Sequence, residues 1–135
     1  MENPLVAAAD AAPTTPALVV DVETLDRNIA RMAEAASAAG LALRPHAKTH
    51  KCPQIAERQI AAGAVGLTVA TIGEAEAFAA GGVTDLFIAY PLWLDDDKRE
   101  RLTKLAASVS CVRVGVESIE NARRIASAVA AGTGE

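Results

Sequence analysis

The sequence predicts an α/β fold in which helices cover a parallel sheet. Short runs rich in Val, Leu and Ile alternate with segments of helical period, and the runs begin about 24 residues apart, which is typical of repeated βα units. Hydrophobic residues make up 51% of the chain but aromatic residues only 3%, which suits helices packed on a buried sheet better than a β-sandwich. With 135 residues, the chain is long enough for one domain with a packed core.

Five apolar runs are predicted to be strands. They are residues 17–22, 41–46, 65–70, 85–90 and 111–116. Side chains alternate along a strand, so Leu43 and Pro45 are expected on one face of the second run and Arg44 and His46 on the other, with Lys48 following if the extension continues.

Helices are predicted between the strands. Apolar residues recur at helical spacing over about residues 24–39, and Gly40 follows as an end signal. A second helix begins at Pro53, a residue suited to the first helical position, and ends before Gly63. The remaining helices are predicted for residues 73–82, 95–108 and 118–132.

The charge balance argues against nucleic acid as a partner. A net charge of −4 gives the molecule no general affinity for polyanions, so the basic stretch RPHAKTHK, residues 44–51, is a local patch in an acidic protein. The partner that fits it best is a small anionic molecule.

Cysteine usage and hydropathy predict a cytoplasmic protein without a membrane span. Cys52 and Cys111 are far apart and form neither a disulfide framework nor a CxxC metal motif, so both are expected to be reduced thiols. Glu2 and Asp10 interrupt the first residues, which therefore do not read as an export signal, and no run reaches the roughly 18 apolar residues of a transmembrane helix.

The basic stretch is the predicted functional site. It follows a predicted parallel strand, and the carboxyl ends of such strands are where α/β folds place their ligands. The amine of Lys48, beside Arg44 and Lys51, is expected to be shifted towards its neutral form, which condenses with aldehydes. Solvated loop cations are the alternative. His46 and His50 lack a third ligand nearby, so no metal site is predicted in this chain.

Four blocks of the sequence resemble the D-threonine aldolase and D-serine dehydratase-like enzymes. The blocks are TPALVVDVETLDRNIARMAEAASAAG, LRPHAKTHK, AAGAVGLTVATIGEAEAFAAGGVTDLFIAYPLW and VRVGVESIENARRIA, and together they cover about residues 14–131. These enzymes are similar in fold to alanine racemases, with a barrel that binds pyridoxal 5′-phosphate (PLP) followed by a β domain. The resemblance implies a Schiff base between Lys48 and PLP, a D-amino acid substrate and a divalent metal bound near the carboxyl end of the full-length enzyme.

The resemblance also suggests further site residues. His46 is expected to touch the cofactor ring or tune Lys48, or else to be a structural histidine, and Thr49 is a weaker cofactor-binding candidate. Tyr90 is expected to line the pocket or to pack. Thr71 lies at the equivalent end of the next strand. The direction of Arg113 depends on the strand register and stays open.

The resemblance implies only part of a larger enzyme. A closed (β/α)8 TIM barrel takes roughly 250 residues, so the chain is either a small open sheet or the front of such a barrel. The resemblance favours the latter: a flexible N-terminus over residues 1–13, and over residues 14–135 the N-terminal part of a PLP-binding barrel, with about four βα units after a preceding strand and helix. The isolated chain is then expected to be weakly active or inactive, and the full-length protein a homodimer.

Three functions remain open at this point. The first is a PLP-dependent lyase of the D-threonine aldolase or D-serine dehydratase type. The second is a PLP carrier without turnover, or an amino-acid racemase of the same barrel type. The third is an α/β module whose basic loop binds a phosphate-bearing metabolite without covalent chemistry.

Overall fold

The computed structural model describes residue 14 and residues 16–133, so the predicted flexible N-terminus lies outside the described residues. Helices and parallel strands alternate along the chain, which confirms the α/β class. The order of elements is α2 (Val22–Ala38), the 3-10 turn η1 (Ala47–Thr49), α3 (Pro53–Ala61), β1 (Leu67–Val69), α4 (Ile72–Ala80), β2 (Asp85–Ile88), α5 (Asp96–Ser108), β3 (Cys111–Val114) and α6 (Ile119–Thr133).

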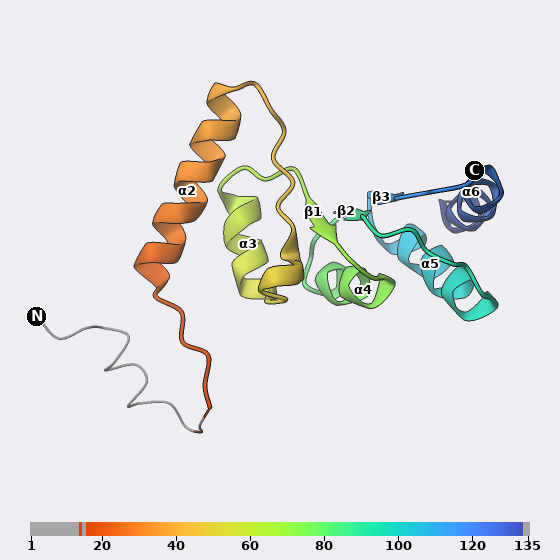
Figure 1. The fold of residues 1–135 in the computed structure, drawn as a ribbon, viewed down its shortest axis with the longest axis horizontal. Helices are drawn as coiled ribbons and strands as arrows, with labels where there is room; N and C mark the ends of the chain where they lie inside the picture. Colours follow the sequence, from red (N-terminus) through yellow and green to blue (C-terminus); the bar gives the residue numbers. More distant parts are fainter. Residues whose placement is uncertain (1–13, 15, 134–135) are drawn as a thin grey trace, which may run out of the picture.

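The strands form one parallel sheet in the order β1-β2-β3. Leu67 pairs with Leu86, and Leu86 in turn with Val112, so the three strands are in step. Each connection passes through a helix, as parallel pairing requires. Figure 1 shows α2, α3, α4, α5 and α6 following one another along the length of the molecule in the order of the sequence.

The predicted strand 41–46 runs parallel to β1 but pairs with it only locally. The Val65 amide donates to the Leu43 carbonyl at 2.9 Å, and the Thr68 amide donates to the Pro45 carbonyl at 2.8 Å. His46 and Thr68 form an isolated parallel bridge. The segment therefore extends the sheet beyond β1 without being a regular strand, because Pro45 has no amide hydrogen to contribute to the ladder.

The prediction of a strand at residues 17–22 is wrong. Residues 17–21 form neither helix nor strand, and Val22 is the first residue of α2. The Asp21 carboxylate accepts the Thr24 amide at 2.9 Å and so caps the helix. Leu18 is 95% exposed, so this β-branched run has no sheet to join among the described residues. Strand propensity alone does not make a strand where a pairing partner is lacking.

Helix signals at Gly40, Gly63, Pro53 and Asp95 are confirmed, whereas Gly132, expected to end the last helix, lies inside α6 (Ile119–Thr133). Gly40 and Gly63 follow α2 and α3 with φ of +67° and +102°, a backbone region that glycine adopts without strain. Pro53 is the first residue of α3. Asp95, the first of the three aspartates, caps α5 by accepting the Lys98 amide at 2.9 Å.

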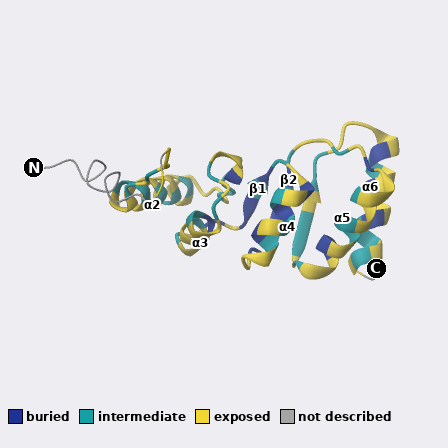
Figure 2. Ribbon diagram, turned by 90° about the horizontal axis from the view of Figure 1, so that it is seen from below, coloured by how far each residue is buried: buried dark blue, intermediate teal, exposed yellow. Residues whose placement is uncertain are grey.

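The core lies between one face of the sheet and helices α4, α5 and α6. Leu67, Leu86 and Ile88 are completely buried, and they pack against buried side chains of those helices. Figure 2 shows the buried residues concentrated in the sheet and the helices near it, whereas α2 has none. The opposite face of the sheet, with Thr68, Phe87 and Arg113, carries no helix and is partly exposed.

Leu86→Ala should lower the free energy of unfolding by about 2–5 kcal/mol, because it removes apolar atoms from the centre of the sheet and leaves a cavity. Leu18→Ala makes the same chemical change at a side chain that is 95% exposed and should cost less than about 0.5 kcal/mol. Urea denaturation followed by circular dichroism measures both. Equal losses for the two variants would contradict the position of the core.

Candidate functional site

Lys48 lies in a tight turn directly after the segment that pairs with β1. We call residues 47–51 the Lys48 loop. The His46 ring nitrogen Nδ1 accepts the Lys48 amide at 3.3 Å, and the Thr49 hydroxyl donates to the His46 carbonyl at 3.4 Å. Ala47 is completely buried beneath the turn. The strand-like alternation therefore stops at His46, and the condition for placing Lys48 on the face of Arg44 and His46 is not met, because the histidine cap starts a turn.

The side chain of Lys48 is exposed, and its amine makes neither a hydrogen bond nor an ion pair with the described residues. The neighbouring cations differ in this respect. Arg44 pairs with Asp85, and Lys51 pairs with Glu74. Both carboxylates come from later βα units. The basic stretch therefore has fewer unpaired positive charges than its sequence suggests.

The Glu74 carboxylate joins the Lys48 loop to the end of β1. One oxygen lies 3.1 Å from the Lys51 ammonium, and the other accepts the Ala70 amide at 2.7 Å. The Thr71 hydroxyl accepts the Glu74 amide at 3.1 Å and caps α4, so Thr71 acts locally as a helix cap. Burial works against ionisation, but the bonds from Ala70 and Lys51, with the charges of Lys51 and His46, outweigh it and hold the pKa of Glu74 below its usual value.

A second charge cluster crosses the helix-free face of the sheet. Asp85 accepts bonds from Arg44 at 2.5 and 3.1 Å and from Arg113 at 2.6 Å. The pKa of Asp85 is lowered, and the hydrogen bond from Arg44 is the largest cause. Burial opposes this shift only in part, because the charges of both arginines add to the lowering. Arg113 therefore lies on the same face as Arg44. Gly66 lies directly beneath, where any side chain would collide with the Arg44 guanidinium and the Asp85 backbone.

The other predicted residues are distributed around this edge. Tyr90 follows β2 by two residues, at the carboxyl edge of the sheet, and is exposed. His46 and His50 each use Nδ1 within their own turn, where His50 accepts the Cys52 amide at 3.1 Å. No group of three or more His, Cys, Asp or Glu side chains that could hold a metal occurs in the part of the chain that the structure describes. Cys52 and Cys111 are free thiols.

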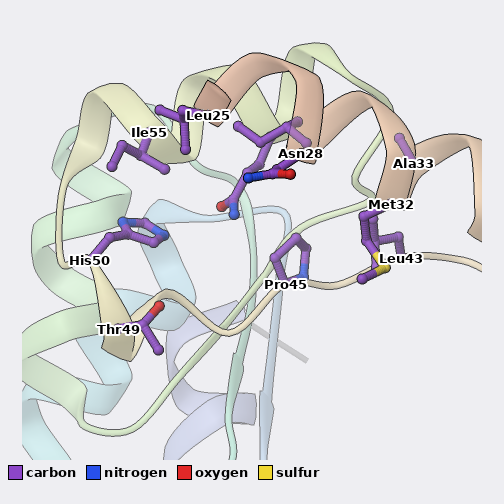
Figure 3. Close-up of a pocket in the computed structure, with 11 residues that line it drawn as sticks. Leu25, Asn28, Met32, Ala33, Leu43, Pro45, Thr49, His50 and Ile55 are labelled. Carbon is purple, nitrogen blue, oxygen red and sulfur yellow. The ribbon is translucent and has the colours of Figure 1, made fainter. Parts of the chain in front are cut away.

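A cavity of about 450 Å³ lies behind the Lys48 loop, between α2, α3 and the segment before the loop. Figure 3 shows His50 and Thr49 at one end of it and Met32 and Leu43 at the other. Most of its lining is apolar, but His50 Nε2 and Gln59 Oε1 are buried there without a hydrogen-bond partner among the described residues. Burial lowers the pKa of His50, and the nearby Gln59 side chain and the Cys52 amide oppose this shift only in part. His46 and Lys48 are not part of this lining.

The fold and the site define an α/β protein of the βα-repeat type, whose polar chemistry lies at the carboxyl edge of a parallel sheet. The family model described as the N-terminal domain of alanine racemase matches residues 20–134. The chain therefore belongs to that family. No helix among the described residues is both long enough and apolar enough to cross a membrane.

Characterised relatives are an aldolase and a dehydratase, which confirms the resemblance seen in the sequence. D-threo-3-hydroxyaspartate dehydratase from Delftia sp. (strain HT23) is 52% identical over 75 residues, 56% of this chain and 20% of that protein. D-threonine aldolase from Arthrobacter sp. is 37% identical over 115 residues, 85% of this chain and 30% of that protein.

Solved structures agree with these matches. D-threonine aldolase from Filomicrobium marinum superposes with a TM-score of 0.82 at 38% identity, over 89% of this chain and 32% of that one. A variant of D-threo-3-hydroxyaspartate dehydratase solved in its metal-free form gives a TM-score of 0.74 at 39% identity, over 90% of this chain and 31% of that one. The chain spans about a third or less of the length of these relatives.

Asp85→Asn should lower the free energy of unfolding at neutral pH by about 1–3 kcal/mol, because two arginines lose their carboxylate. The folded pKa of Asp85 is lowered, so its contribution is complete above the unfolded pKa of about 3.9 and is lost as pH falls through the lower folded value. Denaturation at several pH values should therefore show a weaker acid dependence in the variant.

Asp96→Asn is the matched control, since Asp96 is exposed and forms no ion pair with the described residues. A stability loss at Asp96 equal to that at Asp85, or an unchanged acid profile in Asp85→Asn, would contradict the role of this cluster.

Proposed function

We propose that this chain supplies the lysine-bearing face of a PLP-dependent lyase that acts on D-amino acids. The observation that carries the proposal is the setting of Lys48. Its amine is exposed, lacks a partner among the described residues, and follows the carboxyl end of a parallel segment, which is where α/β folds bind ligands. Membership of the alanine racemase family and the aldolase and dehydratase relatives support it.

The chemistry of the Lys48 loop fits an aldehyde cofactor. Condensation requires an amine that is reachable and not held in an ion pair, and Lys48 meets both conditions, whereas Lys51 is tied to Glu74. In this proposal Lys48 holds PLP covalently, and His46, Thr49 and Tyr90 bind it noncovalently. PLP, when bound, supplies an electron sink for the bond that breaks at the substrate Cα.

The chain's own residues then have defined tasks. The Lys48 amine takes up and returns a proton at Nζ when it is released from the cofactor. The His46 imidazole, whose Nδ1 caps the turn, keeps the loop backbone in place and leaves Nε2 free for hydrogen bonding at this edge. The phenol of Tyr90 offers a hydroxyl at the end of the neighbouring unit.

The proposed substrates are D-amino acids that carry a hydroxyl group on Cβ. The names of the relatives give D-threonine and D-threo-3-hydroxyaspartate, and this group is common to both. An aldolase breaks the bond between Cα and Cβ, whereas a dehydratase expels the hydroxyl group. We further propose that a divalent metal in the whole protein is bound outside the described residues, which contain no suitable cluster of ligands.

We also propose that residues 14–135 are the N-terminal part of a (β/α)8 barrel of the alanine racemase type. Segment 41–46, β1, β2 and β3 would be its first four strands. The parallel order, the helices on one face and the charged opposite face, which would become the barrel interior, support this arrangement.

The chain incubated with PLP and reduced with borohydride should carry a pyridoxyl group mainly on Lys48. Peptide mass mapping identifies the modified residue. Lys48→Arg keeps the positive charge but cannot form the bond, so labelling should fall by about tenfold or more, since only weakly reactive surface amines remain. Lys104→Arg, at another exposed lysine, should label like the parent chain.

Turnover of D-threonine by the same chain should be weak or absent, because the described residues lack the metal ligands of the proposed lyase. Aldehyde release, or 2-oxo acid formation from D-3-hydroxyaspartate, measures it. Labelling spread evenly over the surface lysines would rule out the covalent role of Lys48 and leave noncovalent anion binding. Conversion of D-alanine and of L-alanine into the same racemic mixture would point instead to a racemase.

A further inference from the structure

The Glu74 carboxylate links the Lys48 loop to the end of β1. The Glu74 side chain is only 12% exposed, yet both of its oxygens are engaged outside its own helix. One holds the Ala70 amide at the end of β1, and the other holds the Lys51 ammonium across the loop. This largely buried carboxylate therefore ties Lys51 of the loop to the residue that follows β1.

Lys51 reaches Glu74 from an unusual backbone conformation. Its φ of +48° lies in the left-handed region, and it is the one residue other than glycine with positive φ in the part of the chain that the structure describes. Side chains with a Cβ rarely adopt this conformation unless their surroundings impose it. Here the Lys51 amide donates to the Ala47 carbonyl at 2.9 Å and the ammonium meets Glu74, so both ends of the residue are held.

The two anchors of Lys51 enclose Lys48. Ala47, which receives the Lys51 amide, directly precedes Lys48 and is completely buried. The carboxylate and the Ala47 carbonyl therefore fix the loop on both sides of Lys48, while the Lys48 amine itself stays without a partner among the described residues. The loop is therefore already ordered in the folded chain, and ligand binding need not lose the conformational entropy of a flexible loop.

We propose that Glu74 is a positioning residue for Lys48, acting through Lys51 to hold the Lys48 loop ready for PLP. This inference rests on the proposed function. Glu74 does not touch the cofactor; its role is to preorganise the amine that does. The alternative is that the Glu74 carboxylate serves only to accept the Ala70 amide just before α4, in which case Lys51 would be dispensable.

Four variants separate the two roles. Glu74→Gln removes the charge, and Lys51→Met removes the ammonium while keeping an unbranched stem; the third combines both. Glu76→Gln is the matched control, because Glu76 lies two residues along the same helix and pairs with Arg101 on α5, away from the loop. PLP titration by absorbance, with borohydride trapping and mass mapping at Lys48, gives an apparent Kd for each variant.

Glu74→Gln and Lys51→Met should each weaken PLP loading of Lys48 by about tenfold, as expected for the loss of one charge-assisted hydrogen bond. The double variant should be no weaker than the stronger single variant, because both changes break the same link. Glu76→Gln should stay within about twofold of the parent chain. Hydrogen exchange at the Ala70 amide and through the loop should accelerate in Glu74→Gln and not in Glu76→Gln.

Parent-like loading in Lys51→Met, or effects of the two single changes that multiply in the double variant, would overturn the inference while leaving the proposed function intact. Absence of a Lys48 adduct in the parent chain would instead refute the proposed function. The Lys51 side chain is 66% exposed, so Lys51→Met keeps the link testable if Glu74→Gln fails to fold.

Discussion

Parallel pairing of three short strands over a single buried face governs the rest of this structure. Because β1, β2 and β3 run in the same direction, each needs a helix to return the chain, and the helices gather on one side, where Leu67, Leu86 and Ile88 are buried. The same geometry brings all the carboxyl ends to one edge. The turn with Lys48, the cap of α4 and Tyr90 therefore lie along the same edge of the sheet, although they are distant in the chain.

Ion pairs between different βα units hold the charged side chains that flank Lys48 in place. Arg44 and Lys51 flank Lys48 in the sequence, but each is neutralised by a carboxylate from a later unit, Asp85 or Glu74. Such pairs orient long side chains that would otherwise be free. The Lys48 amine differs from these neighbours in having no carboxylate partner among the described residues. This difference depends on where the acidic groups lie in the fold, and the basic stretch by itself does not reveal it.

The sequence predicted the elements that depend on local signals and missed those that depend on tertiary partners. Gly40, Gly63 and Pro53 marked the helix ends correctly because backbone conformation is a local property. Residues 17–22 have the composition of a strand but lack a partner, which composition does not report. The Thr71 to Glu74 spacing signals a helix cap, and no local pattern indicates that the same carboxylate also reaches Lys51.

The open cavity between α2 and α3 bears on how the molecule unfolds. None of the residues of α2 is buried, and a cavity of about 450 Å³ separates it from α3 and segment 41–46. Helices α4, α5 and α6 instead share one continuous core. Few dispersion contacts therefore bind α2 to the rest of the chain. We therefore expect α2 to detach at a lower cost in free energy than the three-stranded remainder.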